Sequence, residues 1–359
     1  MNDSEPTAAR VNRRILMTRY GGPELMTVVE EPLPEPGPGQ VRVRIQVAGV
    51  GFPDVLVREG TYPRGPRPPF TPGYDFIGTV DKLGPGVSGG VVGQRVGAIT
   101  VYGSHADYLC VPVGWLVPVP VDVDPAEALV VVFNYVTAYQ MLHRTARVRA
   151  KERLLVHGAA GGIGSAVLQL GRLAGLELYG TGSGTDTARI SALGATPIDY
   201  TKEDFLTCVR ELTGEGVDVV LDGIGGAVSL RSYRALRGGG RLVMFGHYST
   251  TVAGRKSMRR IAIFYLAGAM VFAANLIPDG RRVRTFRVAK LRDRRPDWFR
   301  DDALALFDLL QQGKIEPIVT ERIPLIEAGR AHENLGRGGI VGKQVLICDA
   351  GLDSEATNS

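Results

Sequence analysis

Glycines at regular spacing follow an apolar stretch near the middle of the chain. The stretch Leu154–Gly164 (LLVHGAAGGIG) carries Gly158, Gly161 and a final Gly164, and it runs into the apolar-periodic residues 165–175. A strand, a glycine turn and a helix in this order let a bare backbone approach a pyrophosphate at the helix N-terminus. The same glycines also suit an ordinary strand–turn–helix corner. The turn therefore predicts dinucleotide binding, and its surroundings must decide between the two interpretations.

The second strand of such a fold ends here without a carboxylate. An Asp or Glu about twenty residues after the glycine turn would bind the ribose 2′-hydroxyl of NAD(H). The residues at that place are Tyr179–Ser183 (YGTGS), in which Thr181 and Ser183 offer small hydroxyl groups to a 2′-phosphate. Arg189 and Tyr200 are expected to add a charge and a hydrogen bond, which favours NADP(H), so replacing Arg189 with alanine should weaken NADPH more than NADH. If Ser183 is only a helix cap and Arg189 a solvated residue, the choice of cofactor stays open.

From Leu154 onward, strand-like and helix-like segments alternate. Apolar β-branched stretches predict strands, and apolar residues three and four apart predict helices. Such alternation is typical of a doubly wound parallel sheet of the Rossmann type. The predicted strands are Leu154–His157, Leu176–Gly180, Pro197–Asp199, Val217–Asp222, Arg241–Phe245 and Arg282–Leu291, and the predicted helices are Ile163–Leu173, Thr187–Leu193, Glu203–Leu212, Val228–Leu236 and Pro296–Leu310.

The preceding part of the chain is predicted to be an all-β, partly closed sheet. Short strand-like stretches separated by Gly and Pro fill residues 13–120. Among them, Val41–Val50 alternates with the period of two expected of a half-buried strand. Asp124 as N-cap and Pro125 at the first helical position then begin a helix that leads into the second domain.

The length of the chain predicts two domains. A chain of 359 residues is too long for one compact core. We expect a β domain over residues 1–135, to which residues 294–359 return. A dinucleotide-binding domain over residues 136–293 would carry an apolar insertion near 255–280.

The apolar insertion contains Ile261–Ile277 (IAIFYLAGAMVFAANLI), with a pair of arginines on each side. About seventeen residues lie at the lower limit for a membrane span. We do not expect this segment to span a membrane, because Rossmann strands on one side and a globular remainder on the other give it no topology. We expect a buried helix that forms the subunit interface of a homodimer or a lid over the substrate pocket.

Composition and charge narrow the class of protein. The chain is 44% hydrophobic and 22% charged, with a net charge of +5, as in an ordinary globular protein. Arginines gather over residues 281–295, but no recognisable nucleic-acid module accompanies them, so we expect no nucleic-acid partner. The N-terminal residues contain no apolar signal segment, and the three cysteines form no CxxC pair. Both features predict a cytoplasmic protein.

Several short motifs follow one another in an order that can be compared with known families. They are Phe52–Leu56, Gly60–Pro63, Pro72–Asp75, Gly78–Val80, His157–Gly164, Val217–Gly226 and Gly239–Val243. In this order they resemble the medium-chain dehydrogenase/reductase superfamily, and within it the zinc-free quinone oxidoreductases related to zeta-crystallin. The resemblance extends from about Arg13 to Ile347. It implies a GroES-like, partly closed β-barrel domain beside the Rossmann domain.

The residues available for zinc differ from those of the alcohol-dehydrogenase branch. That branch has Gly-His-Glu where this chain has Gly73–Asp75 (GYD), and it carries a cysteine lobe that is missing here. A catalytic zinc needs three protein ligands and an open position. The five histidines and three cysteines show no ligand spacing, so we expect no metal site.

The resemblance implies a set of contacts to the cofactor. Residues after the first, fourth and fifth strands would surround the pyrophosphate, the adenosine ribose and the nicotinamide at the carboxyl edge of the sheet. Thr137 matches a threonine near the nicotinamide, although it would also suit an ordinary helix interior. The implied contacts are Thr137, Ala160, Gly161, Gly162, Ile163, Gly223, Ile224, Phe245 and Gly246.

The resemblance also implies catalytic candidates on the β domain. Tyr62 matches a tyrosine beside the cofactor and substrate, where it would polarise a carbonyl oxygen or donate a proton, unless it is a loop tyrosine packed on proline. Asp54 is the second candidate. Gly51 stands where the family commonly has Asn, which puts the role of Asp54 in doubt and predicts a roomier or differently oriented pocket.

These features predict an NADPH-dependent reductase that transfers hydride, without zinc, to a quinone or an α,β-unsaturated carbonyl. One alternative is a tailoring ketone or enone reductase of a biosynthetic pathway, acting on an unusual ketone or a polycyclic quinone. Another is a cofactor-binding protein with low turnover that acts as a structural or membrane-peripheral component through its apolar segment.

Overall fold

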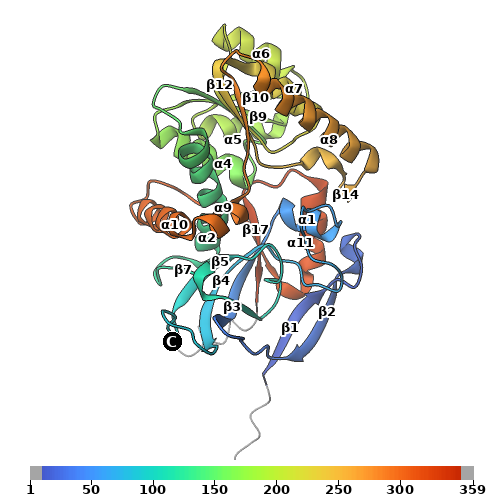
Figure 1. Cartoon of the computed structure of the whole chain (residues 1–359), viewed down its shortest axis with the longest axis vertical. Helices are drawn as coiled ribbons and strands as arrows, with labels where there is room; N and C mark the ends of the chain where they lie inside the picture. Colours follow the sequence, from blue (N-terminus) through green and yellow to red (C-terminus); the bar gives the residue numbers. More distant parts are fainter. Residues whose placement is uncertain (1–9, 349–359) are drawn as a thin grey trace, which may run out of the picture.

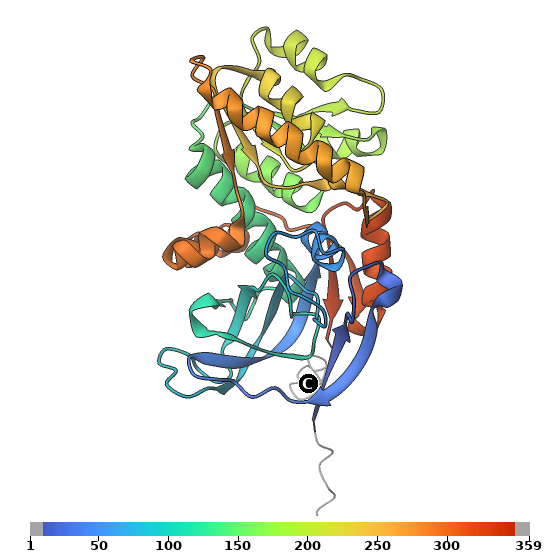
Figure 2. The same cartoon turned by 45° about the vertical axis from the view of Figure 1, so that its right-hand side comes forward.

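The computed structural model describes residues 10–348, which form two lobes (Figure 1). One lobe is built on a six-stranded parallel sheet and the other on a seven-stranded sheet. A β domain followed by a parallel sheet is what the sequence predicted. The red C-terminal segment returns to the blue and cyan β lobe, as Figure 2 also shows.

The β lobe has the strand order β16-β17-β3-β4-β5-β7, with β6 also paired to β3. Along β3 (Gln40–Val50) buried and half-buried residues alternate, as the sequence predicted. β17 pairs antiparallel with β3, with Gln344 opposite Val50, so the end of the chain completes this sheet. The other elements of this lobe are β1 (Val11–Leu16), β2 (Thr27–Pro32), β4 (Asp75–Leu83), β5 (Arg95–Ile99), β6 (Tyr108–Pro112), β7 (Val117–Pro118), β16 (Val319–Pro324), β17 (Lys343–Ile347), α1 (Phe52–Arg58), α11 (Ala328–Arg337), η1 (Pro23–Leu25), η2 (Val113–Trp115) and η8 (Leu325–Glu327).

The parallel sheet has the order β10-β9-β8-β11-β12-β15. The order reverses at β8 (Arg153–His157), so the glycine turn that follows β8 lies at the switch point where doubly wound folds bind ligands. The predicted alternation is confirmed, with boundaries shifted by a few residues. The other elements are β9 (Glu177–Gly182), β10 (Thr196–Asp199), β11 (Val217–Asp222), β12 (Leu236–Met244), β13 (Thr251–Val252), β14 (Arg255–Lys256), β15 (Arg282–Thr285), α4 (Gly162–Leu173), α5 (Thr187–Ala192), α6 (Phe205–Thr213), α7 (Ala227–Ala235), α9 (Val288–Arg294), α10 (Pro296–Gln311), η5 (Gly184–Asp186) and η6 (Tyr248–Thr250).

The last strand is shorter than predicted. β15 stops at Thr285, and α9 occupies most of the rest of the stretch 282–291 that was predicted as strand. Thr285 pairs with Met244, the last residue of β12. Beyond that point the chain has no neighbouring strand to continue the ladder, so it turns into a helix.

A long helical run connects the two lobes. It begins at α2 (Pro125–Val130), where the Asp124 carboxylate accepts hydrogen bonds from the N–H groups of Ala126 and Glu127, as predicted for an N-cap. It continues through wide π-helical turns on either side of α3 (Val136–Tyr139), namely η3 (Val131–Tyr135) and η4 (Gln140–Ala146). Wide turns of this kind often occur at functional sites.

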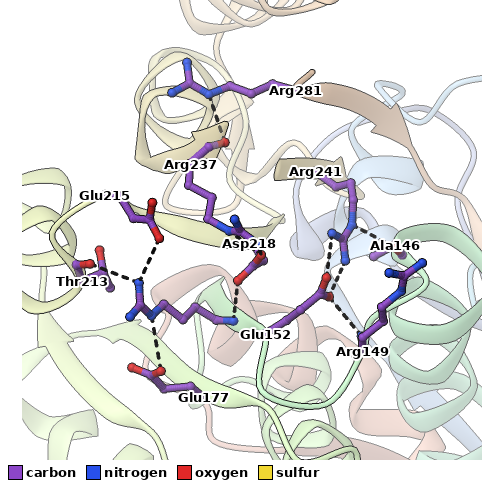
Figure 3. Close-up of polar contacts among 11 residues, drawn as sticks. Ala146, Arg149, Glu152, Glu177, Thr213, Glu215, Asp218, Arg237, Arg241 and Arg281 are labelled. Atoms are coloured by element: carbon purple, nitrogen blue, oxygen red, sulfur yellow. Dashed lines mark hydrogen bonds and ion pairs between the residues drawn. The ribbon is translucent and has the colours of Figure 1, made fainter. Parts of the chain in front are cut away.

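The amino ends of the parallel strands are held by ion pairs, drawn in Figure 3. Asp218 on β11 accepts hydrogen bonds from the backbone N–H of Arg153 and from the guanidinium of Arg237. Glu152 pairs with Arg241 of β12 at 3.0 Å. These side chains lie near the amino ends of the strands. They are therefore on the opposite side of the sheet from its carboxyl edge.

The apolar segment forms α8 (Met258–Ala273) and η7 (Ala274–Leu276), which run along the outside of the parallel-sheet lobe (Figure 2). The prediction of a buried helix is wrong for this chain, since only Ala267 and Val271 of α8 are buried. Within the described residues, Met258–Leu276 is the one helical stretch long and apolar enough to cross a membrane, which by itself is weak evidence.

Candidate active site

One large cavity lies between the two lobes, with a volume of about 1720 Å³. On the parallel sheet its wall follows the carboxyl ends of β8, β9, β11 and β12, where ligands bind in this fold. Asp54, Ser183 and Arg189 are not part of the wall. The predicted site residues that line it are Tyr62, Thr137, Ala160, Gly161, Gly162, Ile163, Thr181, Tyr200, Gly223, Ile224, Phe245 and Gly246.

Two glycines at the start of α4 are packed too tightly to be replaced by residues with side chains. A Cβ on Gly162 would lie 2.1 Å from Asn134 Nδ2, and one on Gly164 would lie 2.3 Å from the carbonyl oxygen of Gly158. The first turn of α4 therefore lines the cavity with bare backbone, and its N–H groups have no partner within the helix. This is the cradle that a pyrophosphate requires.

Four residues of the cavity wall each have a buried polar atom without a partner within the protein. Two of these atoms belong to His247 and Gln344, and the other two are the Thr137 hydroxyl and the side-chain carbonyl of Asn134, three residues apart on the connecting helix. An unpaired buried polar group costs free energy, so a water molecule or a polar ligand is expected to bind these atoms. Sequence reasoning missed Asn134, although its position three residues before Thr137 places both on one helix face.

The end of the cavity beside β9 contains a carboxylate that sequence reasoning missed. Asp186 lines the cavity and accepts hydrogen bonds from the Ser183 N–H at 2.8 Å and the Ser183 hydroxyl at 2.6 Å. The strand end itself, Tyr179–Ser183, has no carboxylate, as the sequence indicated, but a short turn brings the carboxylate of Asp186 back beside it. The Ser183 hydroxyl is engaged in this cap, and Arg189 lies on the exposed side of α5.

Asp54 lies behind the cavity wall and not on it. Its carboxylate is fully buried and accepts hydrogen bonds from the backbone N–H groups of Gly51 at 2.9 Å and Gly73 at 3.1 Å. Burial and the neighbouring Asp75 charge raise the pKa of Asp54 to about 7. We therefore reassign Asp54 from catalysis to positioning, since it holds two cavity-forming segments together.

The raised pKa of Asp54 predicts a pH-dependent stability. Between about pH 4 and the pKa of about 7, the folded protein binds a proton at Asp54 that the unfolded chain has released. The free energy of unfolding should therefore fall by about 1.4 kcal/mol per pH unit as the pH rises through this range. Above the pKa of about 7, Asp54 should add no further slope. Urea unfolding at several pH values measures the slope.

The matched variant for this prediction is Asp54→Asn, which cannot titrate. Burial lowers the pKa of His105 to about 4, so this histidine makes the free energy of unfolding rise with pH, opposite to the effect of Asp54. The histidines are the same in wild type and variant, so the difference between their two slopes reports Asp54. Equal slopes in both proteins would contradict the prediction.

Two tyrosines form a hydroxyl pair on the β-lobe side of the cavity. The Tyr62 and Tyr74 oxygens lie 2.8 Å apart, and the Tyr74 ring also packs against Phe133 at a centroid distance of 5.2 Å. Burial raises the pKa of Tyr62, so its hydroxyl stays protonated at neutral pH. The pair can therefore donate a hydrogen bond or a proton to an oxygen in the cavity.

α8 forms an apolar wall of the same cavity. Ile261, Phe264, Tyr265 and Phe272 line it, which places the segment beside the ligand space, where a lid would lie. A Cβ on Gly51, which also lines the cavity, would make only ordinary van der Waals contacts, none closer than 3.4 Å, so this position could hold a small side chain.

Metal ligands do not gather in the described part of the chain. Among residues 10–348, no group of three or more His, Cys, Asp or Glu side chains is placed to hold a metal ion. The zinc-free reaction stays a prediction.

Comparisons with known proteins agree with this architecture. The alcohol dehydrogenase GroES-like domain matches residues 37–121, and a zinc-binding dehydrogenase model matches residues 193–346. The synaptic vesicle membrane protein VAT-1 homolog of Danio rerio is 30% identical over 346 residues, which span 96% of this chain and 71% of that protein. The quinone oxidoreductase of Pseudomonas syringae pv. Tomato is 30% identical with a TM-score of 0.83, covering 94% of this chain and 99% of that structure.

This chain belongs to the medium-chain dehydrogenase/reductase family, of the quinone oxidoreductase type. The Escherichia coli quinone oxidoreductase, solved in complex with NADPH, is 27% identical with a TM-score of 0.80 over 93% of this chain and 99% of that structure. The predicted fold class, a GroES-like domain with a Rossmann domain, is thus confirmed. As a quinone oxidoreductase-type member, the chain is an oxidoreductase.

Proposed function

We propose that this oxidoreductase transfers hydride from NADPH to a quinone or an α,β-unsaturated carbonyl without zinc. The observation that carries the proposal is one cavity that joins the bare glycine turn, the unpaired Thr137 and Asn134 groups, and the Tyr62–Tyr74 pair. The NADPH complex of the Escherichia coli relative supports the choice of cofactor.

The protein residues would divide the work between binding and proton supply. The turn Ala160–Ile163 would hold the pyrophosphate, and Thr137 and Asn134 would bind polar groups near the nicotinamide. When bound, the reduced nicotinamide supplies the hydride. Tyr62 would donate the proton that, with the hydride, completes the hydroquinone or the saturated ketone, and solvent would reprotonate it. The apolar wall of α8 would exclude water from the acceptor.

The direct test mixes purified protein with NADPH and a panel of quinones and enones. We expect loss of the reduced-nicotinamide absorbance with at least one acceptor. If the protein binds NADPH measurably but no quinone or enone oxidises it, the proposed activity is wrong. A panel that includes polycyclic quinones and unactivated ketones also tests the alternative, a tailoring reductase with a roomy pocket at Gly51.

Removal of the Tyr62 hydroxyl should slow turnover. We expect Tyr62→Phe to lower kcat by about tenfold to a hundredfold while leaving the Kd for NADPH unchanged, because the hydroxyl serves the acceptor and not the cofactor. Tyr74→Phe is the matched control, since it keeps the Tyr62 hydroxyl and removes only its partner, and its effect should be smaller. An unchanged kcat in Tyr62→Phe would remove this residue from the mechanism.

A second candidate function is that of a membrane-peripheral, low-turnover component. The exposed apolar residues Ile263, Leu266 and Met270 favour it, because they form a stripe of α8 outside the cavity wall and have exposed Arg259 beside them. Flotation with anionic phospholipid vesicles tests it. A protein that stays at the bottom of the gradient and oxidises NADPH excludes this candidate.

We propose further that the protein is a cytoplasmic homodimer. All three cysteines are free, which suits a reducing compartment. Light scattering on the purified protein measures the number of subunits.

A further inference from the structure

The cavity wall beside β9 and β10 carries two cations, Arg231 and Lys202. Asp186, Glu203 and Asp204 line this end, and the Arg231 guanidinium that also lines it is already paired with Asp204 and packed over Phe205. The remaining cation of this part of the wall is Lys202.

Lys202 is held in place by its neighbours. Its ammonium lies 3.4 Å from Asp199 Oδ2, and its backbone N–H donates to the Asp199 carbonyl oxygen at 3.0 Å. The other oxygen of Asp199 accepts from the Thr201 N–H and hydroxyl, which keeps the carboxylate oriented. These bonds hold the pKa of Asp199 below its ordinary value, so the carboxylate is charged.

The ammonium stands above the bare backbone that follows β9. A Cβ on Gly184 would lie 3.7 Å from Lys202 Nζ and 2.9 Å from Asp199 Oδ2. Glycine at this position leaves space between the loop and the ammonium. Asp186, which could accept a ribose hydroxyl, has one oxygen engaged by both donors of Ser183.

We propose that Lys202 is the residue that selects NADPH over NADH by pairing with the 2′-phosphate. This inference rests on the proposed function. The inference assigns recognition of the 2′-phosphate to Lys202, in the turn after β10, in place of Arg189, which is exposed and does not line the cavity. Lys202 is 77% exposed and shares its charge with Asp199, so the preference it confers is moderate and sensitive to salt.

The test measures the Kd values of NADPH and NADH by fluorescence for wild type, Lys202→Ala, Lys202→Arg and Arg189→Ala. We expect Lys202→Ala to weaken NADPH by about tenfold and to leave NADH unchanged, because a charge-assisted hydrogen bond is lost. Lys202→Arg should keep most of the preference. Arg189→Ala is the matched control, a neighbouring arginine whose loss should leave the NADPH/NADH ratio unchanged. Added salt should weaken NADPH more in wild type than in Lys202→Ala.

Each other outcome overturns a distinct statement. An unchanged NADPH/NADH ratio in Lys202→Ala, with NADPH still oxidised by a quinone, overturns the role of Lys202 and leaves the proposed function standing. A selective loss of NADPH in Arg189→Ala returns the role to Arg189. Failure of the wild-type protein to bind NADPH overturns the proposed function and this inference together.

Discussion

Replacing Gly164 with alanine should weaken NADPH binding by about a hundredfold, the largest effect we expect from a single methyl group in this protein. The new Cβ would lie 2.3 Å from the Gly158 carbonyl oxygen and 2.7 Å from both Cα and the carbonyl oxygen of Ala159. All of these are backbone atoms of the glycine turn, so no side chain can rotate away. Overpacking of this kind costs about 1 to 3 kcal/mol, and here it displaces the segment that would bind the pyrophosphate. Titration with NADPH measures the loss.

Gly161→Ala is the matched control for this prediction. Its Cβ would meet a single atom, the Gly158 carbonyl oxygen, at 3.3 Å, and its backbone is in a region that alanine adopts. We expect a change in NADPH affinity several times smaller than for Gly164→Ala. Thermal unfolding of both variants shows whether they are folded. Equal affinities in folded Gly164→Ala and wild type would mean that the turn does not bind the cofactor.

Replacing Lys343 with methionine should lower the free energy of unfolding by about 3 to 5 kcal/mol. Lys343 begins β17, and its ammonium lies 2.8 Å from Asp75 on β4 and 4.3 Å from the centre of the Phe133 ring. Both side chains of the ion pair are buried. Burial already raises the pKa of Asp75 and Lys343 opposes the rise, so the variant would leave a carboxylate without a counter-charge. Urea unfolding measures the loss.

The double variant Asp75→Asn/Lys343→Met is the control, because it removes both charges. We expect it to regain a large part of the lost stability, since a neutral pair needs no counter-charge. In Lys343→Met alone, the loss should shrink as the pH falls through the raised pKa of Asp75, because the protonated carboxyl is neutral. A loss that is independent of pH and equal in both variants would show that packing, and not charge, holds β17 in place.

The cavity combines a dinucleotide cradle with an unusually apolar wall. Phe264, Tyr265 and Phe272 of α8 line the cavity, while Ala267 and Val271 are buried. One helix thus serves two surfaces, and Ile263, Leu266 and Met270 form a third, exposed apolar stripe that belongs to neither of them. Bulky apolar acceptors are the substrates that such a wall would favour.

The local elements of the dinucleotide-binding domain could be predicted because each has a short-range signal. The glycine turn, the strand that precedes it and the Asp124 cap depend on residues within a few positions of one another. Most cofactor-side candidates, such as Gly161 and Ile163, also line the cavity, because the carboxyl ends of parallel strands must share one edge.

Only the tertiary structure decided which charged side chains lie together and which residues distant in sequence contact one another. A turn of the chain returns Asp186 to the end of β9, and Lys202 lies near Gly184 at the same edge, whereas Arg189 is exposed and does not line the cavity. The position of the Asp54 carboxylate, which accepts hydrogen bonds from the N–H groups of Gly51 and Gly73, also depends on segments distant in sequence. The same is true of the exposure of α8. Residue types and spacing predicted the parallel sheet and the glycine turn, because these rest on backbone geometry and local periodicity, and the resemblance of the motifs implied the oxidoreductase family. The directions of individual side chains depend on packing between elements, and no local pattern specifies that packing.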